Sequence, residues 1–296
     1  MNNRNNRHLF AVLFLALALL LLSACGSGNA GSAPAPQPTA APSQKTPEAS
    51  KTEAAAPEET GLLAEIRSRG YITIGTEGTW SPYTYHDEND QLVGYDVEVA
   101  RYIADYLGVE ARFSETVWSS MFASLDAGQI DIIVNGVSYT DERAEKYDFS
   151  IPYSYQQKAI LLPADNTDIN GLADLPGKIA ANDSTSTIGQ LALDSGAELD
   201  PVGEMAQSIS EVLNGRADCT LNNLTAFEDY FKQHPEAREQ VKIVTATEPE
   251  PSAYVPVLKG NESLVSEINA ALTQGLSDGT FASLSDIYFG VNVTGA

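Results

Sequence analysis

Few residues of this 296-residue chain have the types and spacing that covalent or metal-assisted catalysis requires. Its 2 Cys and 3 His are too few for a disulfide framework or a closed zinc site. His86 lies in a polar turn and His234 precedes Pro235, so both are interpreted as solvated surface residues. Cys219 falls in an expected strand, where a buried, inert thiol is the usual outcome. Because the sequence offers neither a convincing nucleophile–base pair nor a phosphate loop, it favours binding over catalysis, with no metal or cofactor.

The acidic balance of the chain argues against a second class of function. Its 40 Asp and Glu outnumber its 17 Lys and Arg, giving a formal net charge of −23. Such a surface repels nucleic-acid phosphates, so no nucleic-acid partner is expected. Net charge averages over the whole surface and does not identify a small ligand.

The first residues are typical of an export signal. Arg4 and Arg7 precede an apolar run over residues 9–22, too short for a membrane span of ~20 residues but suited to a signal-peptide core. The run ends in Leu22-Ser23-Ala24-Cys25, which resembles the lipobox of bacterial lipoproteins. We therefore expect a signal peptide over residues 1–24 and a lipid on Cys25. The alternative is an ordinary signal peptide in which Cys25 is incidental.

Residues 26–60 contain no branched aliphatic or aromatic side chain. A segment with nothing to bury cannot offset the entropy lost on ordering, so residues 25–60 are expected to form a lipidated, disordered tether. The expected location is the extracytoplasmic face of the cell membrane, held by the lipid.

From residue 61 onward, strand patterns alternate with helix patterns. Expected strands cover residues 71–75, 111–117, 130–134, 178–181, 199–202, 217–221 and 241–245; expected helices cover residues 97–107, 118–125, 187–193, 206–213, 224–231 and 264–276. Asp96 is expected to cap the first of these helices and Gly108 to end it. Alternating strands and helices predict an α/β protein with mostly parallel sheets, here as two lobes with a binding cleft between them.

Several segments, in order along the chain, resemble the bacterial polar amino-acid solute-binding family (family 3), the capture component of ABC importers. They are Thr76–Tyr83 (TEGTWSPY), Gly94–Ala100 (GYDVEVA), Asn135–Arg143 (NGVSYTDER), Tyr147–Tyr153 (YDFSIPY), Leu258–Gly260, Asp278–Thr280 and Tyr288–Gly290. Within the family, the Glu-Gly-Thr-aromatic loop is most similar to the cystine-binding branch.

The resemblance implies a two-lobe periplasmic-binding-protein fold (type II), each lobe a mostly parallel sheet flanked by helices. Lobe 1 would comprise residues 61–156 and 254–296, and lobe 2 residues 160–248, joined by hinge strands at about 156–160 and 248–254. An amino acid bound in the cleft would close the lobes and be delivered to an ABC permease by a monomeric receptor.

The same resemblance implies the residues of the first-lobe wall. Arg143 would meet the ligand's α-carboxylate with two parallel hydrogen bonds, and backbone groups of Gly136 and Ser138 would supply further donors. Asn135 would be a further ligand-binding residue of this wall. The alternative for Arg143 is a surface ion pair with Asp141 or Glu145.

Three more first-lobe residues match family positions that contact the ligand side chain. Trp80 and Trp118 would sandwich it, although Trp118 also begins an amphipathic run and could belong to the core. Glu77 would bind a polar or positive group of the ligand, such as the distal ammonium of cystine; alternatively, it is a solvated loop acid.

The second lobe departs from the family pattern. Thr185 stands where the family has Gly, while Ser186 and Thr187 could still bind a carboxylate through hydroxyls and helix-start N–H groups. Asn223 stands where the family usually has an Asp that pairs with the α-ammonium, so a charge-assisted bond becomes a neutral one. Asp183 could compensate, or the ligand could lack a standard α-ammonium or bind more weakly.

Two other functions are compatible with this scaffold. Some relatives of the family resemble cyclohexadienyl dehydratases, which use a carboxylate in the cleft as an acid or base. In this chain Glu77 could serve that purpose if burial raised its pKa. An amino-acid sensor reporting to a membrane receptor would use identical capture chemistry. Since a second convincing catalytic group is missing, capture is the favoured interpretation and an enzyme is not expected.

Overall fold

The computed structural model describes residues 61–295. The first lobe is built on a five-stranded sheet in the order β5-β1-β6-β15-β7. Its strands are β1 (Tyr71–Thr76), β5 (Glu110–Glu115), β6 (Ile132–Ile133), β7 (Tyr147–Phe149) and β15 (Pro256–Leu258). Strand β1 runs parallel to β5 and β6, whereas β15 returns antiparallel to β6 and β7. Strand β15, which lies between β6 and β7, therefore comes from a part of the chain about 100 residues further on.

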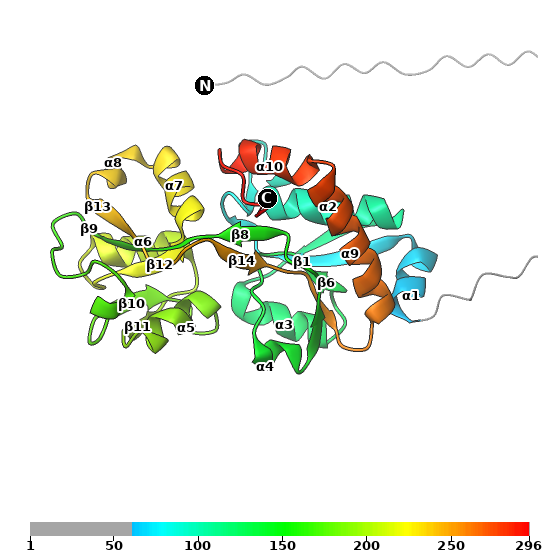
Figure 1. The fold of residues 1–296 in the computed structure, drawn as a ribbon, viewed down its shortest axis with the longest axis horizontal. Coiled ribbons are helices and arrows are strands. Elements are labelled where there is room, and N and C mark those ends of the chain that lie inside the picture. The colour runs from blue at the N-terminus through cyan, green and yellow to red at the C-terminus, as the bar shows by residue number, and fades with distance from the viewer. Residues whose placement is uncertain (1–60, 296) are drawn as a thin grey trace, which may run out of the picture. The chain divides into compact units, whose positions relative to one another are not determined.

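Helices cover both faces of the first-lobe sheet (Figure 1). They are α1 (Leu62–Arg69), α2 (Tyr95–Leu107), α3 (Trp118–Asp126), α4 (Asp141–Ala144), α9 (Glu262–Ser277) and α10 (Thr280–Tyr288). Helices α1, α2, α9 and α10 share one apolar core with Ile72, Ile74 and Ile132, while α3 packs with Ile130 and Ile133 in another. Both cores hold the sheet rigidly, so loops at its strand ends are positioned by packed elements.

Helix α2 corrects one sequence-based expectation. The residue at its N-terminal boundary is Gly94, with φ 131°, not Asp96. Asp96 instead lies inside the first helical turn and is fully buried. The expectation was wrong because the turn into the helix is made by a backbone conformation that favours glycine, which leaves the carboxylate pointing inward.

The second lobe contains β9 (Lys158–Pro163), which runs antiparallel to β12 (Thr220–Asn223) and β13 (Val241–Thr245). Strands β10 (Ile179–Asn182) and β11 (Glu198–Pro201) pair in parallel, and a parallel bridge joins Ala180 to Cys219. The helical elements of this lobe are the 3₁₀ turn Leu172–Asp174, α5 (Thr187–Asp194), α6 (Met205–Leu213), α7 (Leu224–Gln233) and α8 (Pro235–Arg238). The parallel part of the lobe is thus the strand–helix repeat expected from the sequence, and the antiparallel strand is the one that enters from the first lobe.

Two short strands run side by side between the lobes (Figure 1). They are β8 (Ser154–Gln156) and β14 (Glu250–Ala253), which pair antiparallel with an irregularity between Pro251 and Ala253. A small antiparallel sheet of β2 (Thr79–Trp80), β3 (Thr84–His86) and β4 (Leu92–Val93) follows β1. This sheet carries the Thr76–Tyr83 segment, and the Gly94–Ala100 segment begins immediately after it.

Every strand and helix expected from the sequence is present, with boundary shifts of a few residues. The largest shifts are at β6, which is reduced to two paired residues, and at β12, which begins at Thr220 rather than at 217. The signal peptide, Cys25 and the tether lie outside the described residues. Within the described range, no helix combines the length and apolar character that crossing a membrane requires. The same range holds no cluster of His, Cys, Asp or Glu suited to a metal ion.

Candidate functional site

A cavity lies between the two lobes, and residues of both line it. It includes every binding residue expected from the sequence except Arg143: Glu77, Trp80, Trp118, Asn135, Gly136, Ser138, Ser186, Thr187 and Asn223. It also includes Asp183, which the sequence suggested as a possible compensation for Asn223. The other lining residues were not selected from the sequence: Thr79, Lys158, Asn182, Ile188, Val202, Gly203, Glu204, Met205, Ser208 and Asn222. The cavity thus joins loops that lie far apart in the sequence.

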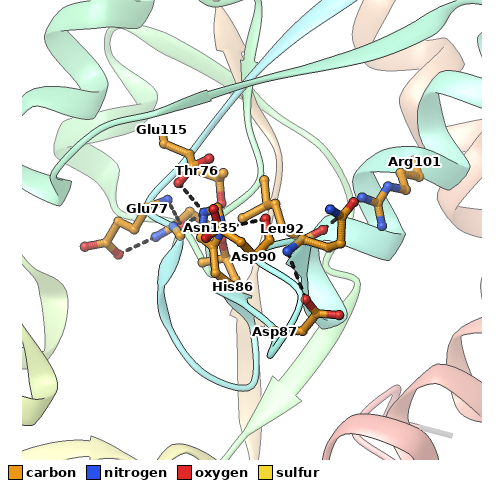
Figure 2. Close-up of polar contacts among 12 residues, drawn as sticks. Thr76, Glu77, His86, Asp87, Asp90, Leu92, Arg101, Glu115 and Asn135 are labelled. Atoms are coloured by element: carbon orange, nitrogen blue, oxygen red, sulfur yellow. Dashed lines mark hydrogen bonds and ion pairs between the residues drawn. The ribbon is translucent and has the colours of Figure 1, made fainter. Parts of the chain in front are cut away.

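Asn135 holds the first-lobe wall together at the ends of β1 and β6 (Figure 2). Its Oδ1 accepts hydrogen bonds from Glu77 N at 2.9 Å and from Thr76 Oγ1 at 3.1 Å. Its Nδ2 donates to Glu77 Oε2 at 2.7 Å. One buried amide therefore fixes both the backbone and the carboxylate of the Glu77 loop.

Glu77 is not the solvated loop acid of the alternative interpretation. Burial raises the pKa of its carboxyl, with smaller upward contributions from Asp183 and Glu204 across the cavity. Hydrogen bonds from Asn135 and from the Trp118 backbone N–H partly oppose that rise. Three carboxylates facing one space favour a ligand that brings a positive charge into it.

Trp80 forms an aromatic layer beside Gly136. Its ring stacks on Tyr83 with centroids 4.0 Å apart and planes inclined by 15°. Gly136 has φ +58°, and a Cβ at this position would lie 2.6 Å from Trp80 Cζ3. The close approach keeps the indole against the backbone of the Asn135–Arg143 segment, and Trp80 also lines the cavity.

We expect Gly136→Ala to destabilise the protein by roughly 2–3 kcal/mol, because it combines left-handed backbone strain with a clash against Trp80. Gly128→Ala is the matched control, since Gly128 has φ +66° but nothing within 4 Å of the place that a methyl group would take. Urea unfolding should therefore show a smaller loss of about 1 kcal/mol for the control. Equal losses for the two variants would contradict the account of the Trp80 contact.

Trp118 and Ser138 complete the first-lobe side. Trp118 begins α3 and makes an edge-on contact with Phe122 at 6.0 Å, so it belongs partly to the core, in line with the alternative interpretation. It nevertheless lines the cavity. Ser138 Oγ accepts a hydrogen bond from Thr187 Oγ1 at 3.3 Å, which links the two lobes.

On the second-lobe side, the Asp183–Ser186 turn leads into α5. Ser186 caps the helix, its Oγ accepting from Gly189 N at 2.9 Å. Thr185, which replaces the family's Gly, donates from both N and Oγ1 to Asp183 Oδ1. The departure at Thr185 therefore ties Asp183 into the turn instead of distorting it.

Arg143 lies next to the cavity rather than in its lining. Nη1 donates to Ser138 O at 3.0 Å and Nη2 to Thr185 O at 3.4 Å, so the guanidinium spans both lobes. It also lies 5.4 Å from the Trp118 ring and 4.9 Å from the Phe122 ring. The described residues form no ion pair with it, including Asp141 and Glu145. Burial lowers the pKa of the guanidinium, which stays a cation in need of an anionic partner.

Asn223 is buried in the cavity lining, where it contacts a residue that sequence reasoning missed. Its Oδ1 accepts from Lys158 Nζ at 2.9 Å, and its Nδ2 donates to Tyr83 OH at 3.0 Å. The sequence contains a signal for this residue, a lysine at the head of the apolar strand KAILLP. Its partner is 65 residues away, however, and only the fold brings the two together.

Further hydrogen bonds join the lobes around the cavity. Tyr83 OH lies 2.6 Å from Thr225 Oγ1, and Ser81 Oγ donates to Asp229 Oδ2 at 2.7 Å. Together with the Thr187–Ser138 and Arg143–Thr185 contacts, they show that the lobes are closed on each other.

His86 and Cys219 have the surroundings expected for them from the sequence, one at the surface and one buried. His86 is partly exposed and pairs with Glu115 at 2.8 Å, which raises the pKa of the imidazole (Figure 2). Cys219 is a buried free thiol whose pKa burial raises to about 12. Neither residue lines the cavity.

Two packed α/β lobes with a polar, aromatic-walled cavity between them define a two-lobe ligand-binding protein. The sequence matches the bacterial extracellular solute-binding proteins, family 3, over residues 72–291, and the chain belongs to that family. It is 40% identical over 234 residues to the L-cystine-binding protein TcyA of Bacillus subtilis (strain 168), covering 79% of this chain and 86% of TcyA. The expected family is thereby confirmed. TcyA is named as a binding protein, which agrees with the expectation that this chain binds a ligand and is not an enzyme.

Two solved structures confirm the fold and bear on its state. An ancestral arginine-binding protein bound to arginine is 34% identical, with a TM-score of 0.70, covering 75% of this chain and 99% of that chain. The L-cystine solute receptor of Neisseria gonorrhoeae, unliganded and open, is 39% identical but has a TM-score of only 0.56, covering 80% and 100%. The lower score at higher identity agrees with the closed arrangement of the lobes in this chain.

Proposed function

We propose that this protein captures a polar amino acid in the cavity between its lobes and delivers it to an ABC permease. The observation that carries the proposal is the cavity itself, which gathers aromatic faces, hydroxyls and charges of both signs from the two lobes. A zwitterion needs such a mixture, because each of its charged groups must find a partner when it leaves water. The relatives named as cystine-binding proteins make cystine the first ligand to test.

Closure would be the functional movement. The lobes are proposed to comprise residues 61–156 with 254–296 and residues 160–248, with hinges at about 156–160 and 248–254. The β8–β14 pair supports this division, since it is where the chain passes between the lobes. Ligand contacts from both walls exist together only in the closed state, so binding would shift the population toward closure.

Within the site, Arg143 is proposed to bind the α-carboxylate. In the closed structure its Nη2 contact to Thr185 O is long, at 3.4 Å, and Ser186 and Thr187 follow in the chain. A ligand carboxylate would replace that weak contact with a charge-assisted one, aided by the start of α5. Trp80 and Trp118 would cover the ligand's apolar part, and Glu77 would receive a positive group.

We also propose a cellular location for the protein. The charged start, apolar core and Leu22–Cys25 tetrapeptide support export and lipid attachment at Cys25, with residues 26–60 as a tether to the extracytoplasmic membrane surface. A monomer suits this arrangement, because the cavity is complete within one chain.

Thermal denaturation against a panel of amino acids tests the capture function. A ligand at 100 times its dissociation constant should stabilise the folded protein by about 2.7 kcal/mol, a shift of several degrees. We expect at least one polar amino acid, with cystine the first candidate, to give that shift. Prephenate and arogenate belong in the same panel, since their turnover would instead support the dehydratase alternative. If no amino acid or close derivative moves the midpoint, capture is contradicted.

A further inference from the structure

Lys158 is a buried cation that forms no ion pair with the described residues. It is 7% exposed, lines the cavity and begins β9. Its Nζ donates to Asn223 Oδ1 at 2.9 Å and to Ser252 Oγ at 3.1 Å, both of which are neutral acceptors. Burial lowers the pKa of its ammonium to about 8, and the charge of Glu250 opposes that fall in part. Leaving a buried charge without a paired opposite charge is costly, so the site is incomplete without an anion.

The cavity is where that anion can come from. An ammonium has three N–H donors, and the described residues accept from two of them. Ser252 Oγ donates its own hydrogen to Glu250 O at 3.0 Å. It is a neutral hydroxyl, so it cannot supply the negative charge that would balance Lys158. Since Lys158 lines the cavity, a ligand group can reach it there.

Asn223 makes this end of the cavity positive rather than negative. An Asp at this position would pair with Lys158 and cancel its charge. The Asn223 amide instead accepts from Lys158 with Oδ1 and donates to Tyr83 OH with Nδ2. An ammonium brought to this place would face Lys158 and be repelled. Positive ligand groups are better received near Glu77, which Asp183 and Glu204 face across the cavity.

We infer that Lys158, held by Asn223 and Ser252, is a specificity-determining residue that binds a second carboxylate of the ligand. The inference rests on the proposed function, in which Arg143 binds the first carboxylate. The ligand class is therefore an amino acid with two carboxylates, and its ammonium lies toward the Glu77 side.

Matched ligand pairs that differ in the second carboxylate test this assignment in the full-length protein. The probes are L-cystine against the mixed disulfide of L-cysteine and cysteamine, which keeps the distal ammonium but lacks the second carboxylate, and L-glutamate against L-glutamine, by isothermal titration calorimetry at pH 7. At least one two-carboxylate probe should bind roughly 10- to 100-fold more tightly than its partner, as expected for a buried charge-assisted contact.

Two variants should remove that ratio by different routes. Lys158→Met deletes the cation, and Asn223→Asp supplies an internal counterion; each should reduce the ratio to within about twofold of unity. Lys146→Met is the control, because it removes a cation from an exposed position outside the cavity, and should keep the ratio. Asn223→Asp also keeps the test decisive if Lys158→Met fails to fold.

The outcomes separate this inference from the function on which it rests. If one-carboxylate amino acids bind the unaltered protein as tightly as their two-carboxylate partners, capture stands and the role of Lys158 is overturned. The same holds if both variants keep the original ratio. If no amino acid binds the unaltered protein, the proposed function fails and this inference fails with it.

Discussion

Replacing Arg143 with alanine is expected to weaken amino-acid binding by at least about 30-fold. Truncating one member of a buried, hydrogen-bonded charge pair costs about 2–5 kcal/mol, and every 1.4 kcal/mol corresponds to a factor of ten. The structure adds a second contribution, because Arg143 itself bridges Ser138 and Thr185 across the lobes. Its removal weakens the closed state as well as the carboxylate contact.

Two further variants separate these effects. Arg143→Lys keeps the charge but loses the paired donors, so it should bind with intermediate affinity. Arg216→Ala removes a guanidinium that pairs with Glu211 away from the cavity, and it should leave affinity unchanged. Calorimetric titration of the best ligand from the panel measures all three. If Arg143→Ala binds within a few-fold of the unaltered protein, Arg143 is a structural bridge and not the carboxylate anchor.

Asp96 should make stability fall as pH rises from about 4 to about 7. It is fully buried beneath Gly136, and burial raises the pKa of its carboxyl from 3.8 to about 7. The Tyr153 hydroxyl and the Gly136 N–H lie beside it and oppose that rise. Neither carboxylate oxygen has a partner of regular hydrogen-bond geometry among the described residues. The neutral acid is therefore the form that the fold prefers.

The direction of this change in stability with pH is set by the number of protons that the folded and unfolded states bind. Between pH 4 and 7 the folded protein keeps a proton on Asp96 that the unfolded chain has lost, so raising the pH favours unfolding. A shift of this size corresponds to about 4 kcal/mol, lost progressively across that window and fully absent above it.

Asp96→Asn isolates this contribution, since an amide does not titrate and all other carboxyl groups are common to both proteins. The free energy of urea unfolding should be measured for each from pH 4 to pH 8. As pH rises, the free energy of unfolding of the variant should increase by several kcal/mol relative to that of the unaltered protein. A difference between the two that stays constant with pH would show that Asp96 does not titrate anomalously.

Residues close together in sequence were the predictable part of the site. Asn135, Gly136 and Ser138 follow a buried strand, and their place at its end requires them to face the cleft. Ser186 and Thr187 are predictable for a similar reason, because a short polar turn must precede α5. The helix positions also follow from periodicity, as α2 and α9 show with apolar residues repeating along one face.

The unpredicted part depends on contacts between distant segments. The ammonium of Lys158 is held in the cavity by Asn223 and Ser252, which are 65 and 94 residues away in the sequence. Asp96 was expected to be a helix cap because Asp favours such positions, but the turn at Gly94 places it in the core. The position of Arg143 outside the cavity lining depends on the closeness of the lobes, which no local pattern encodes.

A crystal structure of the protein with the amino acid that gives the largest thermal shift would show whether the cavity between the lobes is the ligand-binding site. We expect one ligand enclosed between Trp80 and Trp118, with its α-carboxylate on Arg143 and the Ser186–Thr187 turn. A ligand bound elsewhere on either lobe, or one enclosed without any contact to Arg143, would contradict it.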